Sequence, residues 1–81
     1  MNEQLPSPEQ YRERLVKLAF TKMPYGKYQG RYLSDIPEPY IVWLKNNGLP
    51  KGELGNMILE MYEIKANGLE GLLRKIRESA R

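Results

Sequence analysis

The chain has 81 residues and contains neither cysteine nor histidine. Without cysteine it can form no disulfide, no thiolate metal site and no cysteine nucleophile. Without histidine it lacks the usual imidazole base, the usual zinc ligand and the central member of a serine–histidine triad. Its acids are one aspartate and nine glutamates, mostly at helical spacing among basic residues, which is typical of a solvated surface. We therefore expect no enzyme, no metal site and no cofactor.

Long hydrophobic runs are also absent. No apolar stretch approaches the roughly 18 residues that a membrane span needs, and residues 1–4 lack the cationic start and apolar core of a signal peptide. We expect a cytoplasmic protein that makes no membrane contact. A chain this short buries only about 60–65% of its unfolded surface, so homo-oligomerisation is one way to add stability. The expected organisation is a flexible N-terminus over residues 1–6 and one small globular domain over residues 7–81.

Positive charge is concentrated in one part of the chain. Residues 14–34 contain no acid, whereas the rest of the chain carries eight basic and ten acidic residues, so the formal charge of +3 arises entirely from this stretch. It holds five cations and four aromatic residues: Arg14, Lys17, Phe20, Lys22, Tyr25, Lys27, Tyr28, Arg31 and Tyr32. Cations beside flat rings favour a partner that is both anionic and aromatic, such as a nucleic acid.

Helix signals occur at both ends of this stretch. Ser7 through Gln10 form a capping box with proline at the first helical position, and the helix should stop before Pro24. Asp35 is the expected cap of a second helix, which carries an apolar stripe of Tyr40, Trp43 and Leu44 and ends at residues 47–50.

Two further helices are predicted downstream. One carries a stripe from Leu54 to Lys65 at the 3.6-residue period, and the other runs from about Leu69 to Ala80. Gly48 and Gly68 occupy the same position in two Asn-Gly-Leu sequences, so we expect both to end their helices by the same left-handed cap.

Between the first two helices the helical period disappears. The β-favouring residues around Gly26 to Gly30 predict two short strands joined by a glycine-bounded loop, which must lie against the helices because a lone hairpin is marginal in water. The expected fold class is therefore mainly α with a small α+β character: an N-terminal helix, a short two-stranded β-hairpin, and three helices around one core.

The loop is the candidate anion or nucleic-acid site. Glycines let backbone amides approach an anion, cations bind phosphate, and tyrosines stack on unpaired bases. The candidate residues are Lys22, Tyr25, Gly26, Lys27, Tyr28, Gly30 and Arg31. A nucleotide phosphate loop is excluded, because that loop needs Ser or Thr after its lysine at the start of a helix. The alternative is purely structural: the glycines satisfy turn dihedrals, some tyrosines fill the core and the lysines keep an edge soluble.

Other notable side chains have simpler interpretations. Trp43, the single tryptophan, is expected to anchor the core from its helical stripe, with base stacking as the less favoured alternative. Met57 and Met61 are expected to pack in the core. Glu60, Glu63 and Glu70 have no histidine or paired aspartate near them in sequence, so they do not predict a metal site.

The block Met23-Pro24-Tyr25-Gly26-Lys27-Tyr28-Gln29-Gly30-Arg31, with the later sequences Asp35-Ile36-Pro37 and Asn67-Gly68-Leu69, resembles a family of short bacterial proteins of unknown function named putative quorum-sensing-regulated virulence factors. The likeness covers roughly residues 21–70. The same block is similar to the C-terminal module of exonuclease X-like proteins, whose usual form is Pro-Phe-Gly-Lys-Tyr-Lys-Gly-Lys. This chain departs from that form at Tyr25, Gln29 and Arg31. The likeness implies an accessory nucleic-acid contact rather than catalysis.

Two functions remain open on sequence grounds. The first is a small non-catalytic accessory or regulatory module that binds single-stranded nucleic acid through the basic, tyrosine-rich segment. The second is a protein–protein interaction module, with the basic segment attracted to an acidic protein partner.

Overall fold

The structure is a computed structural model that describes residues 7–80. The predicted flexible N-terminus, residues 1–6, lies outside these residues. Four α-helices and one short 3-10 helix follow in the order α1 (Pro8–Phe20), η1 (Leu33–Asp35), α2 (Glu38–Asn47), α3 (Glu53–Ala66) and α4 (Glu70–Ser79). The mainly helical class and all four predicted helices are confirmed.

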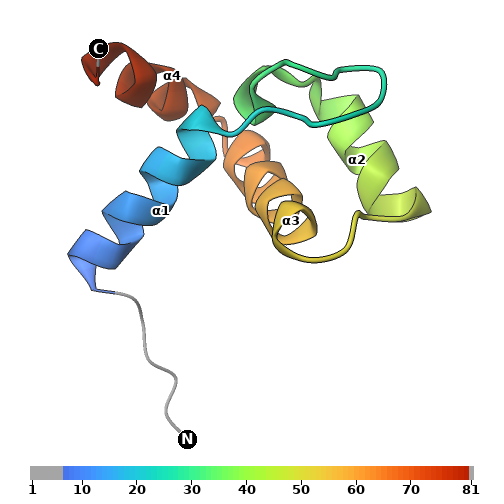
Figure 1. Cartoon of the computed structure of the whole chain (residues 1–81), viewed down its shortest axis with the longest axis horizontal. Helices are drawn as coiled ribbons and strands as arrows, with labels where there is room; N and C mark the ends of the chain where they lie inside the picture. The colour runs from blue at the N-terminus through green and yellow to red at the C-terminus, as the bar shows by residue number, and fades with distance from the viewer. Residues whose placement is uncertain (1–6, 81) are drawn as a thin grey trace, which may run out of the picture.

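The helices pack as two pairs that meet at η1. α1 packs against α4, and α2 packs against α3, while η1 touches α1, α3 and α4. Figure 1 shows the first pair on one side of the molecule and the second pair on the other, with the segment between α1 and η1 running across the top. A single core joins the pairs, and its buried members are Leu18, Ala19, Met23, Leu33, Ile36, Ile41, Leu44, Met57, Ile58, Met61 and Leu73.

The predicted β-hairpin is wrong. Residues 7–80 contain no β-strand, and the pairing between residues 21 and 33 is limited to one antiparallel bridge between Lys22 and Tyr32. Gly26 and Gly30 have φ values of +84° and +88°, which turn the chain twice within a few residues. The amides of Gln29 and Arg31 consequently donate to the carbonyls three residues earlier, so the backbone turns where a strand would have to stay extended.

The helix ends agree with the sequence in part. Ser7 and Gln10 form the predicted capping box, and the amide of Leu69 donates to Ile64 O at 2.9 Å in the predicted left-handed cap around Gly68. Gly48 also has a positive φ, +126°, but its amide donates to Leu44 O as in an ordinary helical turn. The two Asn-Gly-Leu sequences therefore end their helices in different ways.

Asp35 does not cap α2. It ends η1, and the extended Ile36 separates it from α2, which begins at Glu38 without any side-chain cap. Its carboxylate instead accepts from Arg74 Nε at 3.1 Å and lies 3.7 Å from Arg77 on α4. Asp35 thus ties η1 to α4.

Candidate nucleic-acid interface

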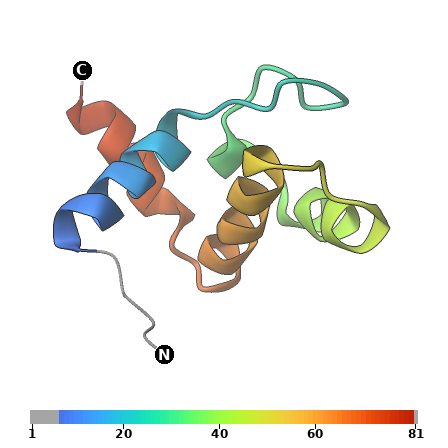
Figure 2. The same ribbon diagram turned by 60° about the horizontal axis from the view of Figure 1, so that its bottom comes forward.

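The basic loop, defined as residues 21–32, is closed at its base and exposed at its tip. Met23 is buried in the core, its amide donates to Arg31 O at 2.8 Å, and its carbonyl accepts from Gly30 at 2.8 Å. Residues 24–27, 29 and 30 are exposed. Figures 1 and 2 both show the loop running above α2. The loop therefore presents its side chains from a fixed base without needing paired strands.

Tyr28 is the central side chain of this loop. It is half-buried and packs its ring against that of Tyr40 on α2, edge to face, with centroids 4.9 Å apart. Lys27 Nζ and Arg31 Cζ each lie 5.5 Å from the centre of the same Tyr28 ring. Such cation–π contacts hold a cation without neutralising it. The main role of Tyr28 is therefore to position two candidate cations. Its own ring has little free face left for stacking.

Two other aromatic rings near the loop are accessible. Tyr25 is 48% exposed, and Trp43 is 54% exposed. Trp43 stacks on Tyr40 with centroids 5.8 Å apart and an interplanar angle of 19°, so an aromatic series of Tyr28, Tyr40 and Trp43 leads from the loop along α2. Gly26 lies next to this series, since a Cβ added there would be 3.7 Å from the Tyr40 hydroxyl.

The prediction that Trp43 anchors the core is wrong. The buried residues of α2 are Ile41 and Leu44, because α2 packs on a single helix, α3. Trp43 lies at the edge of that contact, where one side of the indole meets Tyr40 and the other faces solvent. Sequence reasoning preferred the core role and gave base stacking only as the alternative, whereas Trp43 is the most exposed aromatic residue of α2 and a neighbour of the candidate site.

The cations of the acid-free stretch separate into two groups. Arg14 binds Glu60 through Nε, at 2.9 and 3.1 Å from its two oxygens, and also pairs with Glu53. Lys17 lies 3.5 Å from Glu53. These two cations are therefore neutralised by α3, although their own segment contains no acid.

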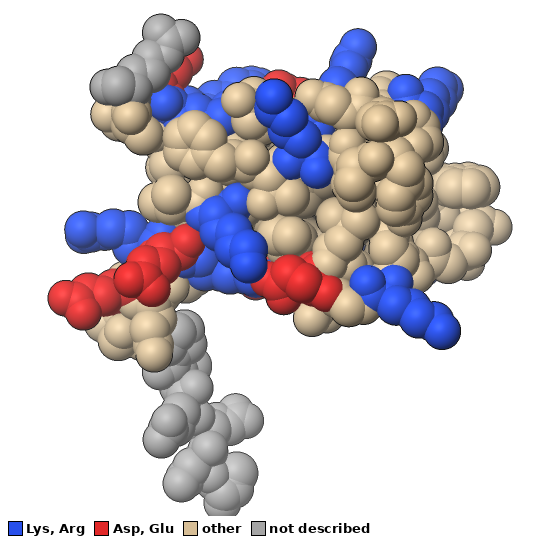
Figure 3. Space-filling view, in the orientation of Figure 1, with Lys and Arg blue, Asp and Glu red and all other residues tan. Residues whose placement is uncertain are grey.

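The three candidate cations have no such partner. Among residues 7–80, no carboxylate lies within 4.0 Å of the charged atoms of Lys22, Lys27 or Arg31. Lys22 Nζ instead lies 5.1 Å from the centre of the Tyr32 ring. Figure 3 shows basic side chains projecting from the upper edge of the molecule, where Figure 1 places the loop. The uncompensated positive charge of the stretch is thus concentrated on the loop.

The contacts with α3 also shift ionisation. Hydrogen bonds to Glu60 and Glu53 raise the pKa of Arg14, and the hydrogen bond from Arg14 lowers the pKa of Glu53. Elsewhere, burial lowers the pKa of Lys65, whose ammonium donates to Ser34 O at 2.8 Å. These groups form internal contacts, away from the loop.

Arg77, like Arg14, is a basic side chain that connects parts of the fold. Its position near the end of α4 did not indicate this role. Its guanidinium donates to Ala19 O at 2.8 Å and to Ser34 Oγ at 2.9 Å, and it lies 4.0 Å from the centre of the Tyr32 ring. It therefore joins α4 to the last turn of α1 and to the base of the loop. Arg77 and Ala19 are 58 positions apart in sequence, so no local sequence pattern could have predicted their contact.

Comparison of the sequence with known proteins identifies a family. Residues 11–76 match the family described as putative quorum-sensing-regulated virulence factor. The chain belongs to this family. Uncharacterized protein YpeB of Escherichia coli K12 is 39% identical over 67 residues, which cover 82% of this chain and 93% of that protein. The protein of the same name from E. coli O157:H7 matches with the same figures. No solved structure is significantly similar to the chain.

The match to the virulence factor family spans the whole candidate site. It includes the loop, Tyr40 and Trp43, together with the α3 residues that neutralise Arg14. Within residues 7–80, no three acidic side chains gather where they could hold a metal ion, and no helix is long and apolar enough to cross a membrane.

Proposed function

We propose that the basic loop and Trp43 bind single-stranded nucleic acid, and that the protein is a small non-catalytic accessory or regulatory module. In this proposal Lys22, Lys27 and Arg31 contact phosphates. Tyr25 and Trp43 stack on bases. The glycines bring the backbone of the loop close to the strand.

The observation that carries the proposal is the combination of free cations with accessible rings. Lys27 and Arg31 are held beside Tyr28 without a carboxylate partner among the described residues, and Tyr25 and Trp43 expose about half of their surfaces. Phosphate charge supplies most of the affinity of such contacts, while aromatic faces accept any unpaired base. Duplex DNA hides its base faces, so a single strand is the better ligand.

The sequence resemblance adds support of a different kind. The block from Pro24 to Arg31 is similar to the C-terminal module of exonuclease X-like proteins, which implies an accessory nucleic-acid contact. Arg31 replaces a lysine of the usual form and keeps a cation with a bidentate grip. Gln29 replaces another lysine and removes one charge.

A salt titration tests the proposal. Binding of fluorescently labelled single-stranded DNA and RNA oligonucleotides is followed by anisotropy at several salt concentrations. The logarithm of the association constant should fall linearly with the logarithm of the salt concentration, with a slope of about −0.7 for each phosphate neutralised. Replacing Lys27 and Arg31 together by glutamine should make the slope less steep by about 1.4, because two phosphate contacts are lost.

The matched control replaces Arg12 and Lys75 by glutamine, which removes the same two charges from a different surface. This variant should keep the slope of the wild type. If the wild-type protein binds neither oligonucleotide at low salt, or if both double variants change the slope equally, the proposal is wrong.

A further inference from the structure

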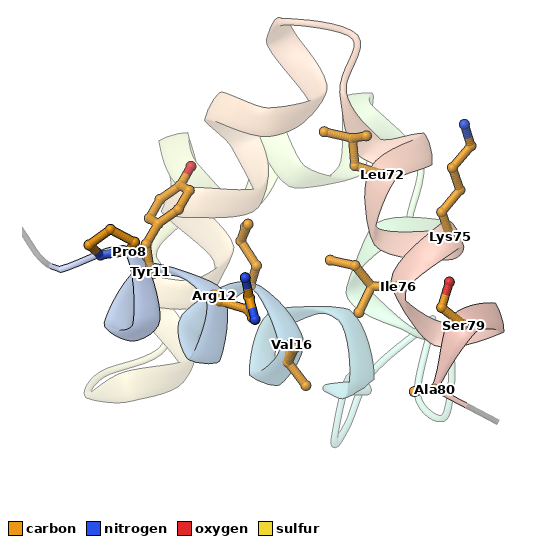
Figure 4. Close-up of a pocket in the computed structure, with 10 residues that line it drawn as sticks. Pro8, Tyr11, Arg12, Val16, Leu72, Lys75, Ile76, Ser79 and Ala80 are labelled. Carbon is orange, nitrogen blue, oxygen red and sulfur yellow. The ribbon is translucent and has the colours of Figure 1, made fainter.

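An open apolar groove lies between α1 and α4, on a surface that shares no residue with the basic loop. It has a volume of about 700 Å³, and its apolar lining comes mainly from Tyr11, Leu15, Val16, Leu72 and Ile76. Figure 4 shows α1 and α4 diverging around it, with side chains from both helices facing the space between. Arg12 on α1 and Lys75 on α4 also line it.

The groove exposes several large apolar side chains together. Tyr11 is 57% exposed, Val16 38% and Leu72 52%. The apolar stripe of α1 continues beyond the core, because Leu18 and Ala19 are buried whereas Tyr11, on the same stripe, faces solvent. A contiguous exposed apolar patch of this kind indicates a binding surface.

The shape and charge of the groove favour one kind of occupant. A second copy of the chain would offer the same concave, positively rimmed surface, so two grooves would neither fill nor neutralise each other. An α-helix is convex, and its apolar stripe can fill a groove between two helices. Among residues 7–80, neither Arg12 nor Lys75 has a carboxylate within 4.0 Å. The two cations, one from each wall, would therefore complement acidic residues on both sides of such a stripe.

We propose that this groove is the docking site for an amphipathic helix of a partner protein, with apolar residues at positions i, i+3 or i+4, and i+7. Acidic residues that flank this stripe pair with Arg12 and Lys75. This inference is independent of the function proposed for the loop, since neither surface requires the other.

Selection from a random peptide library tests the inference directly, because it requires no candidate partner. Peptides of about 16 residues, roughly 24 Å long as helices, are selected on the full chain. Those that also bind the Tyr11→Ala/Leu72→Ser variant are discarded. Tyr11 and Leu72 are about half exposed and lie outside the buried core, so this variant should keep its fold, which circular dichroism checks. The retained peptides should carry the apolar spacing above and be rich in Asp and Glu.

The electrostatic part is tested with the best retained peptide. Replacing Arg12 and Lys75 by glutamate should weaken its binding by about tenfold or more, and changing the acidic residues of the peptide to lysine should restore binding to that variant. The Lys27→Glu/Arg31→Glu variant should bind the original peptide within about threefold of the wild type, since it changes only the net charge at a distance from the groove. Failure of the selection to retain any peptide, or retained peptides without the apolar spacing and the acidic residues, would contradict the inference. A chain that dimerises through the groove, with monomers restored by Tyr11→Ala/Leu72→Ser, would also overturn it.

Discussion

At the scale of single residues, Trp43 adds an exposed aromatic face to the charged loop. Its indole is supported by Tyr40 on one side and is 54% exposed, so a base could cover it without any rearrangement of the protein. Tyr40 in turn supports Tyr28, which holds Lys27 and Arg31. The charge and the stacking face are thus carried by one continuous group of rings.

We expect Trp43→Ala to weaken oligonucleotide binding roughly 5- to 150-fold, the effect of losing about 1–3 kcal/mol of stacking. Its free energy of unfolding should change by only about 1 kcal/mol, because the side chain is half exposed and the main loss is one aromatic pair. Anisotropy titration and urea denaturation measure the two quantities. Tyr11→Ala, which removes an exposed aromatic ring from the groove, should leave oligonucleotide affinity unchanged. Equal affinities of wild type and Trp43→Ala would remove Trp43 from the site.

The sequence identified Lys22, Lys27 and Arg31 as candidate cations, but it could not show that the other two cations of the acid-free stretch are neutralised. Residues 14–34 lack acids, but Glu53 and Glu60 neutralise Arg14 from positions 39 and 46 residues away. The ion pairs of Arg14 and Lys17 with α3, which the sequence does not reveal, distinguish these two cations from the three cations of the loop. The position of Trp43 has a similar cause: a helical stripe identifies a face, whereas the number of neighbouring helices decides how much of that face is covered.

At the scale of elements, α3 is constrained by a glycine that helix propensity does not explain. Gly55 is buried inside α3, and a Cβ added there would collide with the carbonyl oxygen of Pro50 in the connection from α2. The close approach of this backbone fixes how α2 leads into α3. It therefore also fixes where α2 presents Trp43.

Gly55→Ala should lower the free energy of unfolding by about 1–3 kcal/mol, because a backbone atom must move to make room. Helix propensity alone predicts a gain of about 1 kcal/mol. The matched control is Gly71→Ala in α4, where no atom beyond its chain neighbours and the adjacent backbone of its own helix lies within 4 Å of the added Cβ. This variant should raise stability by up to about 1 kcal/mol. Urea denaturation measures the free energy of unfolding of both variants. A Gly55→Ala protein more stable than the wild type would contradict the close contact between Gly55 and the Pro50 carbonyl.

Local signals predicted the helices well and the loop poorly. The capping box at Ser7 and the cap around Gly68 depend on neighbours within a few residues, so the sequence contains what is needed. The segment from Thr21 to Leu33 has the residues of strands, yet Gly26 and Gly30 both adopt positive φ and pull the chain into consecutive turns. The strand propensity of single residues does not indicate whether two segments stay extended and pair in register.

At the scale of the whole molecule, ion pairs connect segments that are distant in sequence. Arg14 links α1 to α3 through Glu53 and Glu60, and Asp35 links η1 to α4 through Arg74 and Arg77. These pairs hold the two helix pairs around a small core. Part of the stability should therefore depend on pH.

The pairing of Glu53 with Arg14 should be visible in acid. The pKa of Glu53 is lowered from 4.5 in the folded protein, so its contribution to stability is complete above the unfolded pKa and is lost as pH falls through the lowered folded pKa. We expect the urea midpoint of Glu53→Gln to fall less steeply than that of the wild type below about pH 4.5.

Glu63→Gln is the control for this measurement, since Glu63 has no cation within 4.0 Å among residues 7–80. Its urea midpoint should follow the wild type across the same pH range. Parallel curves for Glu53→Gln and the wild type would show that the ion pair contributes nothing measurable.

The central claim is that the loop, rather than the net charge of the chain, binds a single strand. Its most direct test compares Lys27→Glu/Arg31→Glu with Arg12→Glu/Lys75→Glu in one anisotropy titration, because both double variants change the formal charge from +3 to −1. Affinity should fall about 30-fold or more when the loop is reversed and only about threefold when the groove is reversed. Equal losses in the two variants would contradict the claim.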